Sequence, residues 1–555
     1  MRRSNSTHTS EPLAHFVNEY LAYLYETYPT EAAADGVHLH DDLLEDVSRA
    51  AIESHARDLG GWARRLDGIN PSGLTKEEAL DRRMLADCVR SRLFALEETR
   101  DWERSPLFYA DTLANSLAAQ VFFAYADPTE RARRIGSKLR QTPRLLEAAR
   151  ENVTEAPGLF VKVGIEALEG VASFVERDLP RAFRDLEDMH LLGDLADASG
   201  EATDALHAYI GHLREKVGPQ SRASFRLGAD RFGQKLRLDD GIDVPAARLL
   251  QVAMRELRAT QAEFKRVAAD IDADPQLAWR QVKARHPDAD ALIATVEGQV
   301  RDLRSFIQRK RIVTVPDHDG VVVAPTPDFY RWTFASLWTA GPFERKRLAA
   351  YYYLTTVDPS WSETRRQEHL RDFSYATLWS ISMHEVYPGH FLHFEHLRQV
   401  DSPLRKSVLF TPTSFVEGWA HYCEQMMLDQ GFERGNTDVK LGQLAEALVR
   451  LARTVVGIKL HTEDLSVEQG MRFFRDEAYL EESSARQEAE RGTFDPSYVL
   501  YALGKQMLLK LRGDCESAEG ARFGLQRFHD RLLGNGGLPF WMHRELMVGS
   551  GTLLE

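Results

Sequence analysis

The sequence has few cysteines and no long apolar run. Three cysteines occur in 555 residues and none forms a CxxC pair, which excludes the disulfide framework of a small secreted domain and favours a reducing compartment. No stretch approaches the roughly eighteen consecutive apolar residues that a membrane-spanning helix needs. Two arginines near the amino terminus are followed by polar residues rather than an apolar region, which argues against an export signal. We therefore expect a cytoplasmic chain that does not bind membranes.

Basic blocks and fixed-period repeats are missing as well. The net charge of −14 opposes a phosphate backbone, and no Lys/Arg block reverses it locally, so nucleic acid is not an expected partner. Apolar residues make up 43% and charged residues 28% of the chain, the balance of a globular protein. Because 555 residues exceed one ordinary core, we expect two intimately packed lobes, an N-terminal helical lobe over residues 1–310 and a C-terminal lobe over residues 311–555.

Helical signatures dominate what is present. Thr75 and Glu78 have the spacing of a capping box, and residues 127–130 combine an N-cap aspartate, an N1 proline and an N3 glutamate. Apolar residues then recur at spacings of three and four. Two such stripes are Leu250, Met254 and Leu257, and Ile293, Val296, Val300, Leu303 and Ile307. These patterns predict a mainly α fold.

One region breaks the helical pattern. Residues 312–315 and 321–323 are β-branched runs separated by a turn-forming segment, residues 316–320, which predicts a hairpin. Residues 348–356 form a third candidate strand. The chain should therefore carry a small antiparallel sheet in its C-terminal lobe. Two roles stay open for this sheet: it closes the lobe, or its edge strand adds an extended peptide through backbone hydrogen bonds.

A His-Glu pair is followed by a second histidine in His384, Glu385 and His390. Zinc sites often take two histidines four residues apart on one helix face. Here the spacing is six, which leaves the side chains roughly 240° apart on an undisturbed helix, against about 40° for a spacing of four. Pro388 and Gly389 offer a remedy, because proline removes a backbone donor and glycine tolerates unusual dihedrals. We expect the chain to bulge there and to bring His390 back beside His384.

A third ligand has to come from elsewhere in the chain. Glu417 is the best source, because it lies in a segment that can be helical and that follows the turn at Pro412. His421 would share its helix face at i+4. Glu385, directly after the first histidine, is placed to act as a general base towards metal-activated water.

The runs HEVYPGH and EGWAHYCE resemble those of the bacterial family called domain of unknown function 885 and, more distantly, those of helical gluzincin metallopeptidases such as carboxypeptidase Taq. The resemblance covers most of the chain. It implies a two-lobed helical metallopeptidase-like fold whose catalytic lobe holds one Zn²⁺ per chain through His384, His390 and Glu417, with Glu385 as the base. It also implies a deep cleft that admits short peptides.

Other histidines have simpler interpretations. His393 and His396 are expected to be ordinary core or surface residues, although His393 is the substitute ligand if His390 points away. His38 and His40 form an HxH pattern, which some barrel enzymes use for metal at a strand end, but no β-branched run precedes it. We expect a loop there.

A further helix is expected to begin at Asp495 and Pro496. Its core stripe would be Leu500, Leu503, Met507 and Leu511. Tyr501 falls near another face and is a candidate catalytic residue that donates a hydrogen bond to an oxyanion. Candidates for supporting the ligands or binding a substrate carboxylate are His421, Tyr498, Arg491, Lys505 and Arg512. The alternative for the basic members of this set is a solvated face.

These observations favour a zinc-dependent hydrolase, in particular a metallopeptidase acting on short peptides. The first alternative is a zinc hydrolase of a non-peptide amide or ester. The second is a metal-binding protein without turnover, in which Glu385 would have no catalytic duty. The sequence leaves the cleavage specificity and the oligomeric state open.

Overall fold

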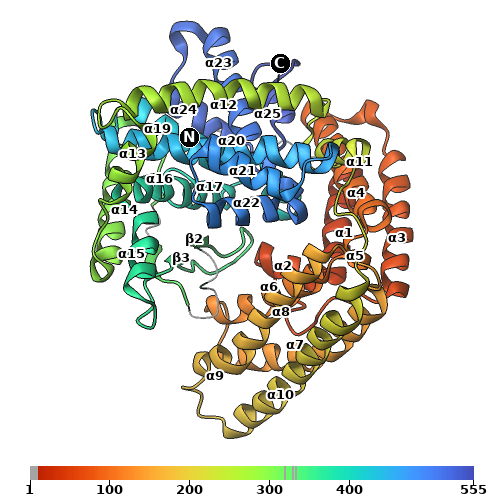
Figure 1. The fold of residues 1–555 in the computed structure, drawn as a ribbon. Coiled ribbons are helices and arrows are strands. Elements are labelled where there is room, and N and C mark those ends of the chain that lie inside the picture. The colour runs from red at the N-terminus through yellow and green to blue at the C-terminus, as the bar shows by residue number, and fades with distance from the viewer. Residues whose placement is uncertain (1–10, 318–319, 328–330, 332–333, 555) are drawn as a thin grey trace. The chain divides into compact units, whose positions relative to one another are not determined.

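The computed structural model describes residues 11–554 except 318–319, 328–330 and 332–333. By its contacts the chain forms two compact units (Figure 1). Unit 1 comprises the chain up to Ser224 together with Phe343–Arg345 and Asp401–Phe410, and unit 2 comprises Phe225–Pro342, Lys346–Val400 and the chain from Thr411 onward. The sequence suggested a division near residue 310, whereas the contacts assign residues 225–310 to the unit that carries the sheet.

The regular secondary structure of unit 1 is helical, with no strand among its described residues. Its core holds a cluster of aromatic side chains that includes Phe16, Tyr20 and Trp62, and its two long helices α7 and α10 pack against each other. The helices are α1 (Glu11–Thr27), α2 (Pro29–Asp35), α3 (Arg49–Asp67), α4 (Lys76–Phe94), α5 (Asp101–Arg104), α6 (Pro106–Phe122), α7 (Pro128–Asn152), α8 (Gly158–Ser173), α9 (Leu179–Ala182), α10 (Met189–His212) and α18 (Pro403–Lys406).

Unit 2 packs its helices around a large apolar core. It also carries a small sheet at residues 321–354, of which Figure 1 labels β2 and β3. Its helices are α11 (Ala229–Asp240), α12 (Ala246–Ala268), α13 (Pro275–Lys283), α14 (Leu292–Lys310), α15 (Glu363–Asp372), α16 (Tyr375–Glu385), α17 (His390–Leu397), α19 (Thr413–Asp429), α20 (Thr437–Thr462), α21 (Val467–Ala478), α22 (Glu482–Phe494), α23 (Leu500–Glu519), α24 (Leu525–Gly534) and α25 (Phe540–Met547). No helix in the described part of the chain is long and apolar enough to cross a membrane.

The local helix signals are confirmed. Thr75 and Glu78 form a reciprocal capping box before α4, and Asp127 caps α7 by accepting from the Thr129 N–H, with Pro128 at N1. On α14 the stripe faces inward, since Val296, Leu303 and Ile307 are buried, and the predicted stripe on α23 is buried as well. A short 3₁₀ turn, η9 (Pro496–Val499), precedes α23. The mainly α prediction is therefore correct.

The sheet is mixed rather than antiparallel. Its order is β1 (Val321–Pro325), β3 (Ala350–Leu354), β2 (Ala335–Trp338). The central strand β3 is parallel to β1 and antiparallel to β2. Two of the predicted strands therefore exist, but they are neighbours in a parallel pair. The hairpin is wrong, and its predicted turn lies partly outside the described residues.

Residues 312–315 form no strand, because their backbone groups are bonded to side chains. Asp530 accepts from the Thr314 N–H at 2.7 Å, His396 lies 2.7 Å from the Thr314 carbonyl, and His529 lies 2.8 Å from the Ile312 carbonyl. Ile312 and Val313 are buried. These β-branched residues therefore belong to an extended segment of the core that pairs with no strand among the described residues.

Two glycines allow α19 and α23 to cross at close range. A Cβ on Gly418 would lie 2.6 Å from the Cα of Gly504, and one on Gly504 would lie 2.0 Å from the carbonyl oxygen of Ser414. Side chains at either position would separate the helices. This crossing brings the start of α23 beside the first turns of α19, which carry Glu417.

Candidate metal centre

The chain breaks between the two histidines instead of bulging within one helix. Helix α16 ends at Glu385 and α17 begins at His390. An ideal Cβ on Gly389 would lie 1.7 Å from the carbonyl oxygen of His384, so only glycine fits where the chain folds back over the last turn of α16. The result matches the expectation that His390 returns beside His384, since their ring centroids are 4.7 Å apart.

Helix α19 supplies the third member of a group of candidate metal donors, hereafter the metal group, which consists of His384, His390 and Glu417. Glu417 Oε2 lies 3.3 Å from His384 Nε2 and 3.5 Å from His390 Nε2. In the described part of the chain, His384, His390 and Glu417 form the one group of His, Cys, Asp or Glu side chains whose ligand atoms all lie within 4.8 Å of one another. The structure thus brings together the three residues that the sequence suggested as ligands.

The donor set fits zinc. Zinc takes imidazole and carboxylate donors at about 2.0–2.2 Å in tetrahedral sites, so adjacent donors stand roughly 3.3–3.6 Å apart. The two separations given above lie in that range. Glu417 Oε2 is buried and has no hydrogen-bond partner among the described residues, although buried carboxylate oxygens are normally bonded. An oxygen left unpaired between two imidazole nitrogens is what a shared cation would satisfy.

Glu424 bonds to the ring nitrogen of His384 that does not face Glu417. Its Oε1 lies 2.8 Å from His384 Nδ1, and its Oε2 accepts from the Ser380 hydroxyl at 3.1 Å. With Nδ1–H donating to Glu424, Nε2 is the ring nitrogen that faces Glu417, and a bound metal would displace the proton from it. A carboxylate behind a ligating histidine fixes the tautomer and the ring orientation in many metal sites.

Electrostatics in the group follow from burial and close partners. Burial lowers the pKa of His384, but Glu417 and Glu424 outweigh it and raise that pKa to about 9. Burial would raise the pKa of Glu417, yet the facing imidazoles hold it well below its usual range. Burial would likewise raise the pKa of Glu424, and the positive charge of Arg450 is the largest influence that holds it low. Both carboxylates are therefore anionic.

Glu385 is the last residue of α16 and is half-buried. The sheet lies against this helix, since the Tyr352 hydroxyl of β3 is 3.4 Å from the Ser382 hydroxyl. The negative charge of Glu385 contributes to a raised pKa of Tyr352, after the larger effect of burial. The sheet is therefore next to the proposed base.

Tyr501 stands next to the metal group. Its ring is nearly parallel to that of His384, with 6.4 Å between centroids, and the Arg453 guanidinium lies 5.3 Å from its centroid. Burial raises the pKa of Tyr501 to about 12, with a further contribution from Glu417 and an opposing one from Arg491. The hydroxyl is thus a protonated donor at neutral pH.

The other candidates have varied positions. His421 is buried with Nδ1 3.4 Å from Glu424 Oε2, and Lys505 is buried nearby, where burial lowers its pKa to about 8. Arg491 bonds to Asp495 and keeps 36% of its side chain exposed. Tyr498 is wholly buried against Gly457 and Gly492, a position that suits a core residue rather than a substrate contact. Arg512 bonds to Tyr422 and Glu516, neither of which belongs to the metal group.

Three other histidines considered in the sequence, His393, His396 and His38, lie outside the metal group. His393 is buried, and neither of its ring nitrogens has a hydrogen-bond partner within the described ranges. His396 bonds to the Thr314 carbonyl. In unit 1 the HxH segment is a loop, and His38 lies 2.8 Å from both Asp41 and Glu344. His38 therefore has structural partners, and the metal group does not include it.

Sequence reasoning missed Glu424, Arg450, Ser380 and part of the role of Trp419. Trp419 is a core residue, and its indole N–H also donates to the carbonyl of Pro388 at 2.9 Å, which ties α19 to the break between the histidines. Glu424 was detectable in principle, since it lies seven residues after Glu417 on the same helix face. Ser380 and Arg450 carried no such signal.

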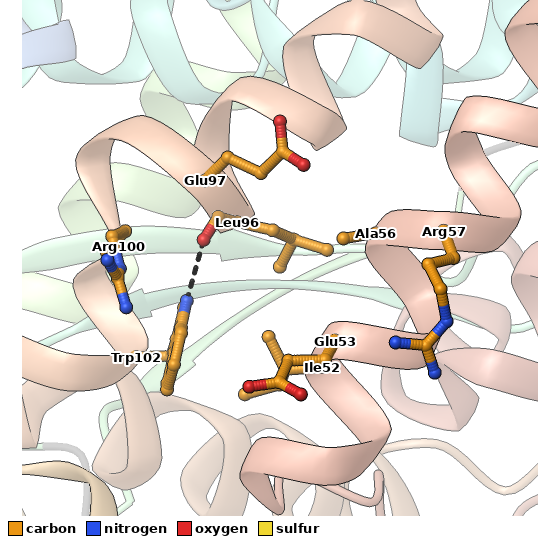
Figure 2. A pocket seen from close by; sticks show the side chains of 8 residues that line it. All are labelled: Ile52, Glu53, Ala56, Arg57, Leu96, Glu97, Arg100 and Trp102. Atoms are coloured by element: carbon orange, nitrogen blue, oxygen red, sulfur yellow. Dashed lines mark hydrogen bonds between the residues drawn. The ribbon is translucent and has the colours of Figure 1, made fainter.

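A surface pocket is found in unit 1, and it contains none of these residues. Figure 2 shows its lining, to which α3 contributes Glu53 and Arg57 from adjacent turns. Trp102 donates its indole N–H to the Leu96 carbonyl at 2.9 Å. The pocket combines exposed ion-forming side chains with one packed ring and brings no nucleophile, histidine or metal-binding group together.

The fold and the donor group define a mainly α protein with a candidate metal centre. Residues 29–547 match the family described as "Bacterial protein of unknown function (DUF885)". This match spans most of the chain, and the protein therefore belongs to that family, as the two motifs suggested.

Solved structures of two bacterial proteins are among those that share the fold. One, from Shewanella oneidensis, is described as "a putative lipoprotein of unknown function"; it has a TM-score of 0.80 and 24% identity, covering 97% of this chain and 99% of that chain. The other, described as "the putative lipoprotein from Colwellia psychrerythraea", has a TM-score of 0.80 and 15% identity, covering 96% and 97%. No curated protein matches the chain. At these identities the likeness concerns the fold alone.

Proposed function

We propose that the protein is a zinc-dependent hydrolase, and specifically a metallopeptidase that cleaves short peptides. The observation that carries the proposal is the buried Glu417 oxygen, which has no hydrogen-bond partner in the described chain and faces two imidazole nitrogens at 3.3 and 3.5 Å. Three protein donors suit a catalytic zinc site, which keeps its fourth position for water or substrate. We expect one Zn²⁺ per chain.

Three side chains would hold the metal: His384, His390 and Glu417. When bound there, zinc would supply a Lewis acid that makes water acidic enough to lose a proton near neutral pH. Glu385 directly follows His384 and is half-buried at the end of α16. In the proposed mechanism its carboxylate accepts the proton from water and later passes it to the leaving amine.

Tyr501 would stabilise the charge that develops on the substrate oxygen. Its hydroxyl stays protonated at neutral pH because burial raises the pKa of this residue. Arg453 against its ring restricts the side chain, and Arg453 is itself held by two 2.7 Å bonds to Glu488. A donor fixed in this way needs little reorganisation during the reaction.

The substrate class follows from the resemblance to helical gluzincins, which favours short peptides. Arg491 is a partly exposed cation near Tyr501 and would be available to a substrate carboxylate. A zinc hydrolase of another amide or of an ester would use the same residues. A binding protein without turnover would keep the metal but would not need Glu385.

The test compares wild type with Glu385→Gln and His384→Ala. Metal content is measured by elemental analysis, and turnover is measured on a peptide selected from a mixed library. Glu385→Gln should keep its zinc and lose about 10²- to 10⁴-fold in rate, the usual contribution of general-base assistance. His384→Ala should lose both.

Three outcomes would count against the proposal. Undiminished turnover in Glu385→Gln would refute the mechanism. Absence of zinc from the wild type would refute the metal site. Metal-replete wild type that is inert towards broad peptide, amide and ester panels would leave a metal-binding protein.

A cytoplasmic location remains a separate prediction, to be checked by cell fractionation.

A further inference from the structure

Behind the metal group lies a buried ionic chain that the proposed mechanism does not use. Glu424 is fully buried and has three close partners: His384 Nδ1 at 2.8 Å from Oε1, the Ser380 hydroxyl at 3.1 Å from Oε2, and Arg450, whose Nη2 forms an ion pair with Oε1 at 3.1 Å. Arg450 belongs to α20, whereas His384 and Ser380 belong to α16. The carboxylate is therefore fixed by two helices other than its own.

This fixation is needed because a glutamate carboxylate does not orient itself. The last torsion of glutamate is broad rather than confined to staggered wells. With His384 as its only donor, Oε1 could swing while keeping one hydrogen bond. A cation on a second side of Oε1, together with the donor on Oε2, leaves one orientation in which all three contacts are made.

Arg450 is itself held in place. Its Nη1 donates to Glu446 Oε2 at 2.7 Å and to the Glu446 carbonyl at 3.0 Å, and only 8% of the residue is exposed. Its Nη2 lies 3.5 Å from His384 Nδ1. Since a guanidinium only donates, it offers no acceptor for the imidazole proton. Glu424 is then the acceptor for His384, and Nε2 faces the ligand site.

We propose that Arg450 is a positioning residue of the metal centre: it acts through Glu424 to set the orientation of His384 and thereby the affinity of the site for zinc. The inference rests on the metal site of the proposed function, but it concerns metal binding and not turnover. Partners of this kind contribute about 10- to 100-fold to metal affinity.

The test is a double-mutant cycle on zinc affinity, measured by competition with a chromophoric chelator. Arg450→Met and Glu424→Gln should each weaken binding by about 10- to 100-fold. Arg450→Met should add no more than about a twofold loss in the Glu424→Gln background, since independent sites would instead contribute in full. Arg450→Lys keeps the charge without the fork and should bind with intermediate affinity.

Arg405→Met is the matched control. It removes another arginine that is as little exposed as Arg450, one whose carboxylate partner is Asp81 rather than Glu424, and it should leave zinc affinity unchanged. A second readout is the visible spectrum of the cobalt(II)-loaded protein, which responds to ligand orientation. It should shift in Arg450→Met and stay unshifted in Arg405→Met, with circular dichroism confirming that both variants are folded.

Three results would overturn the inference. The first is an equal loss from Arg450→Met in both backgrounds. The second is tighter zinc binding by Arg450→Met, which would show that the arginine only repels the metal. The third is an unchanged affinity and cobalt spectrum. If wild type binds zinc and one of these results is found, the inference fails alone, whereas a wild type that binds no zinc refutes the proposed metal site as well.

Discussion

A methyl group added at Gly504 tests the helix crossing that assembles the site. In Gly504→Ala the new Cβ would lie 2.0 Å from the carbonyl oxygen of Ser414 and 2.8 Å from the Cα of Gly418, both on α19. Non-bonded carbon atoms pack at about 3.5–4.0 Å. Helices α19 and α23 would therefore have to move apart by roughly 1 Å at this point.

The magnitude follows from two opposing effects. Overpacking a well-filled core destabilises a protein by about 1–3 kcal/mol, and the upper part of that range applies because the atoms met are backbone atoms. Alanine in a helix interior recovers about 0.5–1 kcal/mol relative to glycine. We expect a net destabilisation of about 1–2 kcal/mol. Glu417 adjoins Gly418, so zinc affinity should fall by about tenfold or more, as when a ligand loses its support.

The assay pairs thermal unfolding with zinc affinity and uses Gly513→Ala as the control. Gly513 lies on the same helix, and no described atom comes within 4 Å of a Cβ built there. This control should unfold at or slightly above the wild-type temperature and keep its zinc. The reasoning would be refuted if Gly504→Ala unfolded as late as Gly513→Ala and bound zinc as tightly as the wild type.

Two further predictions use other parts of the structure. His390→Ala should lose stoichiometric zinc and His393→Ala should keep it, by elemental analysis; the reverse pattern would reassign the ligand. Burial raises the pKa of Asp240 to about 7 although the Ser414 N–H donates to its carboxylate. Because this exceeds the unfolded value of about 3.9, Asp240 contributes less stability as pH rises from about 4 through 7. The free energy of unfolding of Asp240→Asn, relative to that of the wild type, should therefore increase by on the order of 1 kcal/mol or more between pH 5 and pH 8. Urea midpoints at the two pH values measure it. The same difference between variant and wild type at both pH values would contradict this.

The helices were predictable because their signals are local. The capping box at Thr75 and Glu78 needs only residues three apart, and the stripes on α14 and α23 need only the helical period. The mixed sheet was not predictable in the same way. Strand β1 pairs directly with β3, although β2 lies between them in the sequence. Strand β2 shows no alternation of buried and exposed residues that could have indicated it.

The three candidate ligands of the site were predictable from the sequence, whereas the residues that support them were not. His384, His390 and Glu417 carried a recognisable chemical pattern in two short runs, and the structure brings them together. The residues behind them depend on tertiary packing: Arg450 reaches Glu424 from a separate helix, and nothing in its surrounding sequence distinguishes it from a surface arginine. Tyr498 shows the opposite failure, since its position near Tyr501 in sequence did not reveal that it is wholly buried.

The unusual spacing of the two histidines has a structural explanation in α19. On one continuous helix, side chains six residues apart diverge by roughly 240°, so the donor group requires a break between them. Gly389 permits the break, because no Cβ fits beside the His384 carbonyl, and Trp419 bonds to the Pro388 carbonyl within it. Glu417, two residues before Trp419, faces both imidazoles. One helix therefore supports the loop that returns His390 and also supplies the carboxylate, so the spacing of six and the EGW run form a single structural unit.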